Sequence, residues 1–412
     1  MKKIIASAVG LMLVGGVAVT TAQAVESQFG GYWRTRFTYS DNMGTKEAAT
    51  ANSKADNDTG SWYRTDARTR LYYTAKFNDD FKFVNKFEFN TNWGNTNNNA
   101  DFGGGGVGAD GKGNFRIKNS YADFTLGMLN SKVGIQGNTL ARGFLFADDF
   151  SGVVEQINLD GTQDSGTRIQ FGYMAVSNDG TNITQGGDSN IYFISPYFDV
   201  NDKIRLNPHA SLLYESGTDT SIYWTGIDAD LTFDAFSAWV TTAYNGGEVN
   251  NNDISAYLVA AGAEAGIVHG QAFYATGDKS DPEVRNSGDI DQFQSMPGQS
   301  YYWSEIMGLG TFDQNASSGS PADKIANIAA FNVGVTLMPA DKMTLTLDAW
   351  YAFLDRDNAD GEDQLGLEFD GKLSYKLMDN LNADLIAAYL IADDATGDDD
   401  VFEGGLQLSL KF

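Results

Sequence analysis

Six basic side chains recur at alternate positions in three neighbouring segments of the chain. Basic residues two apart on an extended strand point to the same side of it, so this spacing predicts one charged column. The column can attract and steer anions, or it can be neutralised by nearby acids such as Asp66 and Glu88, and both interpretations stay open. Its members are Arg34, Arg36, Arg64, Arg68, Arg70 and Lys86.

A second candidate is the stretch NTLARGFLFADDFSG at residues 138–152. It sets two adjacent carboxylates, Asp148 and Asp149, beside Arg142 and the apolar run 144–146. Charges of both signs at one narrow place can sort solutes by charge; the alternative is an ordinary surface loop. A third set consists of acids on later segments, namely Asp228, Asp230, Glu264, Asp348, Glu368 and Asp370.

Signals for enzyme chemistry are weak throughout the chain. His209 and His269 are its two histidines, cysteine is absent, and no Ser-His-Asp pattern is clustered. The acidic stretch at 355–363 misses the spacing of a calcium loop because position 359 is Ala. We therefore expect no enzyme, no metal site and no cofactor.

The charge balance argues against one class of partner. The chain has 54 acidic and 28 basic residues, a net charge of −26, whereas nucleic-acid binding needs clustered Lys and Arg to displace counterions from phosphates. The 46 glycines and the 26 Phe, 19 Tyr and 7 Trp residues indicate a β protein with many turns. No nucleic-acid partner is expected.

The first 24 residues have the pattern of an export signal. Lys2 and Lys3 precede an apolar run at 4–19, and Ala22-Gln23-Ala24 forms a small-x-small cleavage site. An uncleaved anchor is the alternative, but the cleavage site and the polar segment after it favour removal. We predict a cleaved signal peptide over residues 1–24 and a single barrel domain over residues 25–412.

The remainder reads as about 18 runs that alternate apolar and polar residues. In the run at 27–40, for example, Phe29, Trp33 and Phe37 share one face, and Arg34 and Arg36 share the other. Short links such as 79–80 and 378–380 alternate with long polar links such as 41–61 and 277–327. This alternation predicts an all-β, antiparallel up-and-down transmembrane β-barrel of about 18 strands, or 16, with both termini at the periplasmic short-turn end.

A sheet with an apolar outer face and a charged inner face would expose a large apolar surface to water. In lipid the same arrangement is favourable, provided that the sheet closes. The last run carries its apolar face through to the chain end, at Phe402, Leu406, Leu408, Leu410 and Phe412. On these residues and the signal peptide, the chain resembles Gram-negative outer-membrane porins. In that family a C-terminal aromatic, here Phe412, is the signal read by the barrel-assembly machinery.

Three further stretches resemble the homotrimeric porins of sulfate- and metal-reducing bacteria: FYATGD at 273–278, YYWSEIMGLGTFD at 301–313 and SPADKIANIAAFNVGV at 320–335. The resemblance implies a trimer in the cell outer membrane of a Gram-negative bacterium, in contact with lipid and lipopolysaccharide. It also implies passive diffusion of small hydrophilic solutes and ions. By the same resemblance, the third extracellular loop folds into the barrel and sets Asp148 and Asp149 opposite the arginines.

Other functions remain open at this stage. A substrate-specific outer-membrane channel, or an exporter of acidic polysaccharide, would share the strand number and the arginine-lined lumen. An outer-membrane hydrolase would need a catalytic cluster, which the sequence does not show. A barrel that surrounds an electron-transfer cytochrome would need a partner that carries the haem, because the chain has no cysteine to attach one.

Overall fold

A computed structural model of the chain describes residues 25–43, 60–94, 103–105, 114–160, 166–177, 188–216, 218, 220–278, 288–308, 310–312, 325–358, 360–397 and 399–412. The predicted signal peptide at residues 1–24 lies outside these ranges, as do parts of the long links. What the sequence predicts for those residues stays a prediction.

The described chain is built almost entirely of β-strands. Of its nineteen strands, β4 has only three residues, so eighteen are long. In chain order the strands are β1 (Glu26–Asp41), β2 (Ser61–Asn78), β3 (Phe81–Trp93), β4 (Gly103–Gly105), β5 (Asn114–Leu126), β6 (Leu129–Leu140), β7 (Phe146–Asn158), β8 (Arg168–Ser177), β9 (Ser189–Asn201), β10 (Ile204–Glu215), β11 (Thr220–Thr232), β12 (Ser237–Val249), β13 (Asn252–Ala265), β14 (Val268–Ala275), β15 (Ile328–Leu337), β16 (Met343–Phe353), β17 (Gln364–Met378), β18 (Leu381–Ala392) and β19 (Val401–Lys411).

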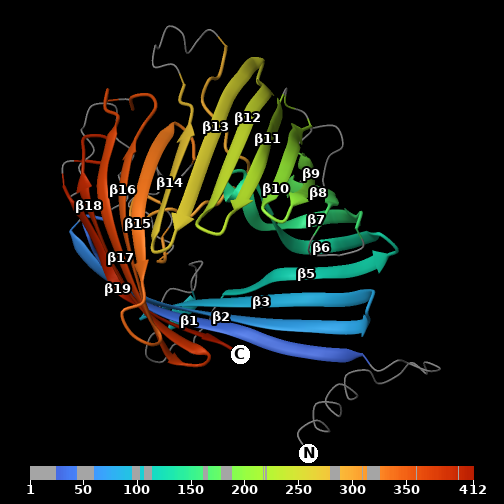
Figure 1. Cartoon of the computed structure of the whole chain (residues 1–412), viewed down its shortest axis with the longest axis horizontal. Helices are drawn as coiled ribbons and strands as arrows, with labels where there is room; N and C mark the ends of the chain where they lie inside the picture. Colours follow the sequence, from blue (N-terminus) through green and yellow to red (C-terminus); the bar gives the residue numbers. More distant parts are fainter. Residues whose placement is uncertain are drawn as a thin grey trace, which may run out of the picture.

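The long strands close into a barrel (Figure 1). Each pairs antiparallel with the next long strand in sequence, and β19 pairs with β1 from Tyr32↔Lys411 to Asp41↔Phe402. Short β4 adds a parallel pairing to the end of β3. The predicted antiparallel barrel with eighteen long strands is confirmed.

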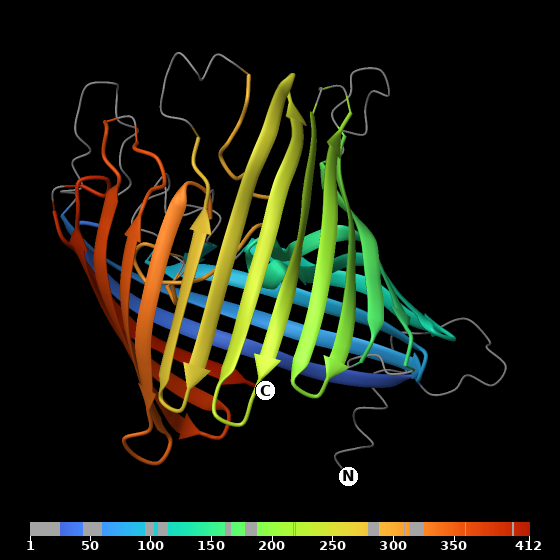
Figure 2. The same ribbon diagram turned by 45° about the horizontal axis from the view of Figure 1, so that its top comes forward.

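The two ends of the barrel differ, as the alternating links predict (Figure 2). One end carries two-residue turns such as Asp79–Asp80 and Asp202–Lys203, and β1 starts and β19 finishes there. The other end carries the long links, with one tight exception at Asn250 and Asn251. Both of these asparagines have positive φ, 52° and 64°, as a two-residue hairpin turn with φ > 0 at both central positions requires.

The outer surface of the wall is apolar and the inner surface is polar. In β1, Phe29, Phe37 and Tyr39 are exposed on the outside, whereas Arg34 and Arg36 are buried on the inside. Exposed aromatic and aliphatic side chains continue around the wall, for example Tyr192 on β9 and Tyr257 on β13. The sheet thus meets its surroundings with the face that a water-soluble sheet would bury.

One hairpin leaves the wall. The pairing of β6 with β5 ends at Ser120↔Ile135, so the residues of β6 after Ile135 are not paired with β5. In the same way, β7 pairs with β8 only from Ser151↔Ala175 onward. Residues 136–140 and 146–150 instead pair with each other and lead into η1 (Ala141–Gly143), inside the barrel. We call residues 136–150 the inward hairpin. The predicted loop at 138–152 was wrong in extent, because its ends continue β6 and β7 and only residues 141–145 lie between the strands.

No helix among the described residues has both the length and the hydropathy needed to cross a membrane.

Closure at the chain end generates a first prediction. The Gly31 N–H donates to the Phe412 carbonyl at 2.7 Å, and the Phe412 N–H donates to the Gly31 carbonyl at 3.1 Å. We expect deletion of Phe412 to remove both bonds, about 2 kcal/mol of closing free energy, and to lower the yield of the heat-modifiable barrel on semi-native electrophoresis. Phe412→Tyr is the control and should assemble normally; an unchanged yield after deletion would contradict the prediction.

Candidate functional site

The basic column lies on the inner face of β1, β2 and β3, and two acids on the same strands pair with four of its six members. Asp66 binds Arg36 at 3.0 Å and Arg64 at 3.3 Å. Glu88 binds Arg70 at 2.6 Å and Arg68 at 3.6 Å, and Arg68 also donates to Asn90 at 2.8 Å. These ion pairs correspond to the second interpretation in the sequence analysis, in which nearby acids such as Asp66 and Glu88 offset the charge of the column. Lys86 rests over the ring of Tyr72, 5.2 Å from its centre, and Arg34 is buried beside these pairs.

The third-loop acids make their direct contacts with β5 and with each other. Asp149 pairs with Lys118 of β5 and accepts a bond from Asn119 at 2.8 Å. Asp148 is exposed and accepts the backbone N–H of Asp149 at 2.7 Å. Asp149 also acts electrostatically on Lys86 of the basic column. Lys118, a lysine absent from the predicted column, thus makes the direct contact with the hairpin, and the opposition of both acids to the arginines stays a prediction.

The tip of the inward hairpin is fixed to the opposite wall through Arg142. Ala141 and Arg142 both have positive φ, 48° and 56°, so the chain turns sharply here. The turn aims the Arg142 guanidinium at Asp230 of β11, with which it forms an ion pair, and over the Trp239 ring at 5.1 Å. The hairpin therefore bridges the lumen from β6–β7 to β11–β12.

Phe144 forms the apolar part of this bridge. Its fully buried ring stacks on Tyr301 with centroids 3.8 Å apart and meets Trp239 and Phe273 at 6.1 and 5.7 Å. Burial raises the pKa of the Tyr301 hydroxyl to about 12, so this loop residue stays neutral and donates to Gln271. Four rings from the hairpin, the wall and the long loop pack together at this point.

The long link between β14 and β15 also folds inward, which the sequence analysis did not anticipate. We call its described residues 288–308 and 310–312 the inner loop. Its first part lies along β11–β13: Ile290 donates to the Asp253 carbonyl at 2.7 Å, and Trp224 donates to the Gln294 carbonyl at 2.8 Å. Its middle part holds the hairpin, through the Ala147 N–H to the Gly298 carbonyl at 3.0 Å.

The end of the inner loop crosses to β17 and β1. Glu368 accepts the N–H groups of Ile306 and Met307 at 2.6 and 2.8 Å, and Arg36 donates to the Thr311 carbonyl at 3.0 Å. The signal for this path was in the sequence, because Trp303, Ile306, Met307 and Phe312 are unusually apolar for a solvated loop. All four of these side chains are buried.

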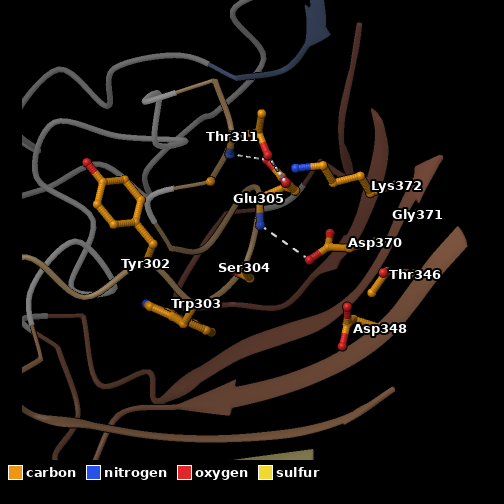
Figure 3. Close-up of a pocket in the computed structure, with 11 residues that line it drawn as sticks. Tyr302, Trp303, Ser304, Glu305, Thr311, Thr346, Asp348, Asp370, Gly371 and Lys372 are labelled. Carbon is orange, nitrogen blue, oxygen red and sulfur yellow. Dashed lines mark hydrogen bonds between the residues drawn. The ribbon is translucent and has the colours of Figure 1, made fainter. Parts of the chain in front are cut away.

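Between the hairpin, the inner loop and the wall lie three cavities that share lining residues. A cavity of about 350 Å³ contains Arg116, and a second of about 780 Å³ contains Gln170 and Tyr197; Lys118, Asp148 and Asp149 line both. Tyr302 lines the second cavity and a third of about 390 Å³, which also contains Trp303, Glu305, Asp348, Asp370 and Lys372 (Figure 3). The shared residues show that the three cavities are neighbours along the lumen, and we call this row of cavities the charged path.

The path offers binding surfaces without the geometry of a metal centre. Within the described ranges, no three His, Cys, Asp or Glu side chains are grouped so as to hold a metal ion. Charged groups of both signs line the path: Lys118 pairs with Asp149 in two of the cavities, and Lys372 lies with Asp348 and Asp370 in the third. Such an arrangement can orient dipolar and charged solutes as they pass.

The aromatic bridge generates a second prediction. We expect Phe144→Ala to remove packing worth about 3–5 kcal/mol and to free the hairpin tip, so that trypsin cleaves after Arg142 in the folded barrel. Mass spectrometry of the fragments reports the cut. Phe115→Ala, at a ring that is 55 % exposed, is the matched control and should leave Arg142 protected. Equal protection in both variants would contradict the bridge.

No protein-family model matches the chain, and no curated protein matches it. Several solved structures match the chain. OpdK from Pseudomonas aeruginosa matches with a TM-score of 0.60 at 12 % identity, covering 94 % of this chain and 98 % of that one. A BenF-like porin from Pseudomonas fluorescens Pf-5 gives 0.58 at 11 %, over 94 % and 98 %. OprD from Pseudomonas aeruginosa gives 0.57 at 12 %, over 96 % and 97 %. At this identity the likeness concerns the fold, and the chain has the barrel fold of outer-membrane porins.

Proposed function

We propose that this protein is an outer-membrane channel for passive diffusion of small hydrophilic solutes and ions, and not an enzyme. The observation that carries the proposal is the charged path, a row of three cavities inside a closed barrel whose outer face is apolar. Lipid favours such an outer face, and water and ions favour such a lumen. The fold shared with OprD and OpdK supports the same function and a Gram-negative outer-membrane location.

The inward hairpin and the inner loop would set the size limit of the channel. Both fold into the lumen and are bonded to the wall away from their own strands, through Arg142 to Asp230 of β11 and through Ile306 to Glu368 of β17. A solute must pass between these crossings and the wall that carries Lys118 and Tyr197. The same crossings disfavour an exporter of acidic polysaccharide, because a polymer needs an unobstructed path.

A substrate-specific channel for small molecules is the second candidate. The structural neighbours include a structure of OpdK with vanillate, and Arg168 stacks over Tyr197 at 4.0 Å beside the largest cavity. A guanidinium over an aromatic ring can present a planar binding surface to a solute. Saturation of solute flux at high concentration would distinguish this function from free diffusion.

The proposed channel function also implies partners in the outer membrane. Contact with lipid and lipopolysaccharide follows from the apolar outer face, and recognition of Phe412 by the barrel-assembly machinery follows from the porin resemblance. We also propose a homotrimer on that resemblance, and a signal peptide cleaved after residue 24.

Reconstitution tests the channel function directly. The purified, heat-modifiable barrel should produce discrete conductance steps in planar bilayers and should let small sugars swell liposomes. Larger oligosaccharides should enter slowly, because the cavities narrow the lumen. Protein boiled before reconstitution is the control for detergent leakage. Folded barrel that inserts into liposomes and yet passes neither ions nor sugars would refute the proposal.

Ion selectivity provides a sharper prediction. Asp148 is exposed in the path, and an amide oxygen in its place can still accept the Asp149 N–H. A unit charge about 8 Å from a passing ion in water contributes about 0.5 kcal/mol, with opposite signs for a cation and an anion, so Asp148→Asn should lower the cation-to-anion permeability ratio about fivefold. Reversal potentials across a salt gradient measure this ratio. The control Asp379→Asn, in a turn whose side chain is 97 % exposed, should leave it unchanged.

A further inference from the structure

The end of the inner loop is a small unit held together by its own bonds. The Glu305 carboxylate accepts the backbone N–H of Thr311 at 2.5 Å and its hydroxyl at 2.8 Å. The Gly308 N–H donates to the Ser304 hydroxyl at 2.7 Å. We call the described residues of 304–312 the knob. These bonds lie within the knob and do not involve the barrel wall.

Carboxyl groups on β17 hold the knob against the wall. Glu368 is fully buried, and its two oxygens accept the N–H groups of Ile306 and Met307. Asp370, one inward position further along β17, accepts the Glu305 N–H at 3.3 Å (Figure 3). The contact thus brings a carboxyl of the knob next to two carboxyls of the wall.

A fourth carboxyl lies behind the same contact. Glu403 of β19 is fully buried, and neither of its oxygens has a hydrogen-bond partner among the residues that the structure describes. In the sheet, Ala388 is the cross-strand neighbour of both Asp370 and Glu403, so a single small residue separates the two acids along the wall. Glu403 also interacts electrostatically with Glu305 and Glu368.

The other charged groups at this contact do not balance four ionised carboxylates. Lys372 acts on Glu305. Arg36 and Arg64 act on Glu403, but both also pair with Asp66. Asp348 on β16 adds a further acid to the cavity and is bonded to His269 of β14. Ionised like charges brought together in a dry contact repel strongly, so such groups retain protons.

We propose that Glu305, Glu368, Asp370 and Glu403 form a shared proton-binding site that latches the knob to the wall, and that their ionisation releases the knob and widens the lumen. The inference rests on the proposed channel function for its consequence, since a wider lumen passes more current. The latch itself is a property of the loop and the wall.

The sign of the pH dependence follows from the burial of these groups. Burial raises the pKa of the Glu305 carboxyl above its ordinary value. A carboxyl whose pKa is higher in the docked state stabilises docking fully below its free pKa, and it loses that contribution as the pH rises through the docked pKa. The knob is therefore held most firmly in acid and least firmly in alkali.

A labelling experiment reads the latch without any transport measurement. The chain has no cysteine, so Met307→Cys places one thiol at a site that is 3 % exposed in the docked knob. Its maleimide labelling rate is divided by that of Asp79→Cys, in a turn where the side chain is 94 % exposed, to remove the intrinsic pH dependence of thiols. We expect the ratio to rise about tenfold between pH 6 and pH 10, because ionisation of the docked carboxyls removes their contribution to docking.

Neutral substitutions identify the groups responsible. Glu403→Gln removes one of the four ionisable groups without removing a hydrogen bond to any described residue, so it should keep the knob docked and make the rise of the ratio with pH smaller. Asp384→Asn removes another inward acid, on β18, outside the contact, and should preserve the rise. Ile306→Cys repeats the measurement if Met307→Cys does not give a heat-modifiable barrel.

Conductance recorded over the same pH range separates the two proposals. The unsubstituted barrel should conduct more at pH 10 than at pH 6, and this increase should be smaller in Glu403→Gln. A barrel that conducts while the labelling ratio stays constant overturns the latch and leaves the channel intact. A rising ratio in a barrel that conducts nothing overturns the channel and leaves the latch intact. Equal pH responses of the unsubstituted barrel and Glu403→Gln also overturn the latch.

Discussion

Every other feature of this molecule depends on closing the sheet so that the backbone groups of the wall are paired. An open edge would leave N–H and C=O groups unsatisfied, which lipid does not tolerate. The pairing of β19 with β1, continued by the bonds between Phe412 and Gly31, completes the ring. Once it is closed, alternate side chains must point inward, and the polar ones among them line the lumen.

The constraint explains which parts of the structure could be predicted from the sequence. Two-residue alternation is a local property, so strands such as β1 and β18 and short turns such as Asp79–Asp80 were predicted closely. The pairing of Arg36 with Asp66 and of Arg70 with Glu88 was one of two open interpretations, because cross-strand neighbours are close in sequence. The inner loop was missed because its partners are distant: Ile306 bonds to Glu368, 62 residues away.

The inward hairpin was missed in part for a related reason. Its residues Asn138–Leu140 and Phe146–Asp148 keep a regular strand register with each other, and local periodicity does not reveal where a pair of strands departs from the wall. The apolar run of Phe144 and Leu145 was a usable signal, since it needs an apolar partner. The identity of that partner, the group of Tyr301, Trp239 and Phe273, depends on the tertiary structure.

The two structures that cross the lumen differ in how they are held, and this makes the aperture mechanically asymmetric. The hairpin continues two wall strands, so backbone hydrogen bonds of the sheet transmit the stiffness of the wall to Asp148 and Asp149. The inner loop is held at separate points, by backbone bonds to β13 near its start and by side chains such as Asn245 and Glu368 further along. The opening through the lumen is therefore bordered by a stiff hairpin on one side and a more compliant inner loop on the other. A chemical change in the lumen would displace the inner loop more readily than the hairpin.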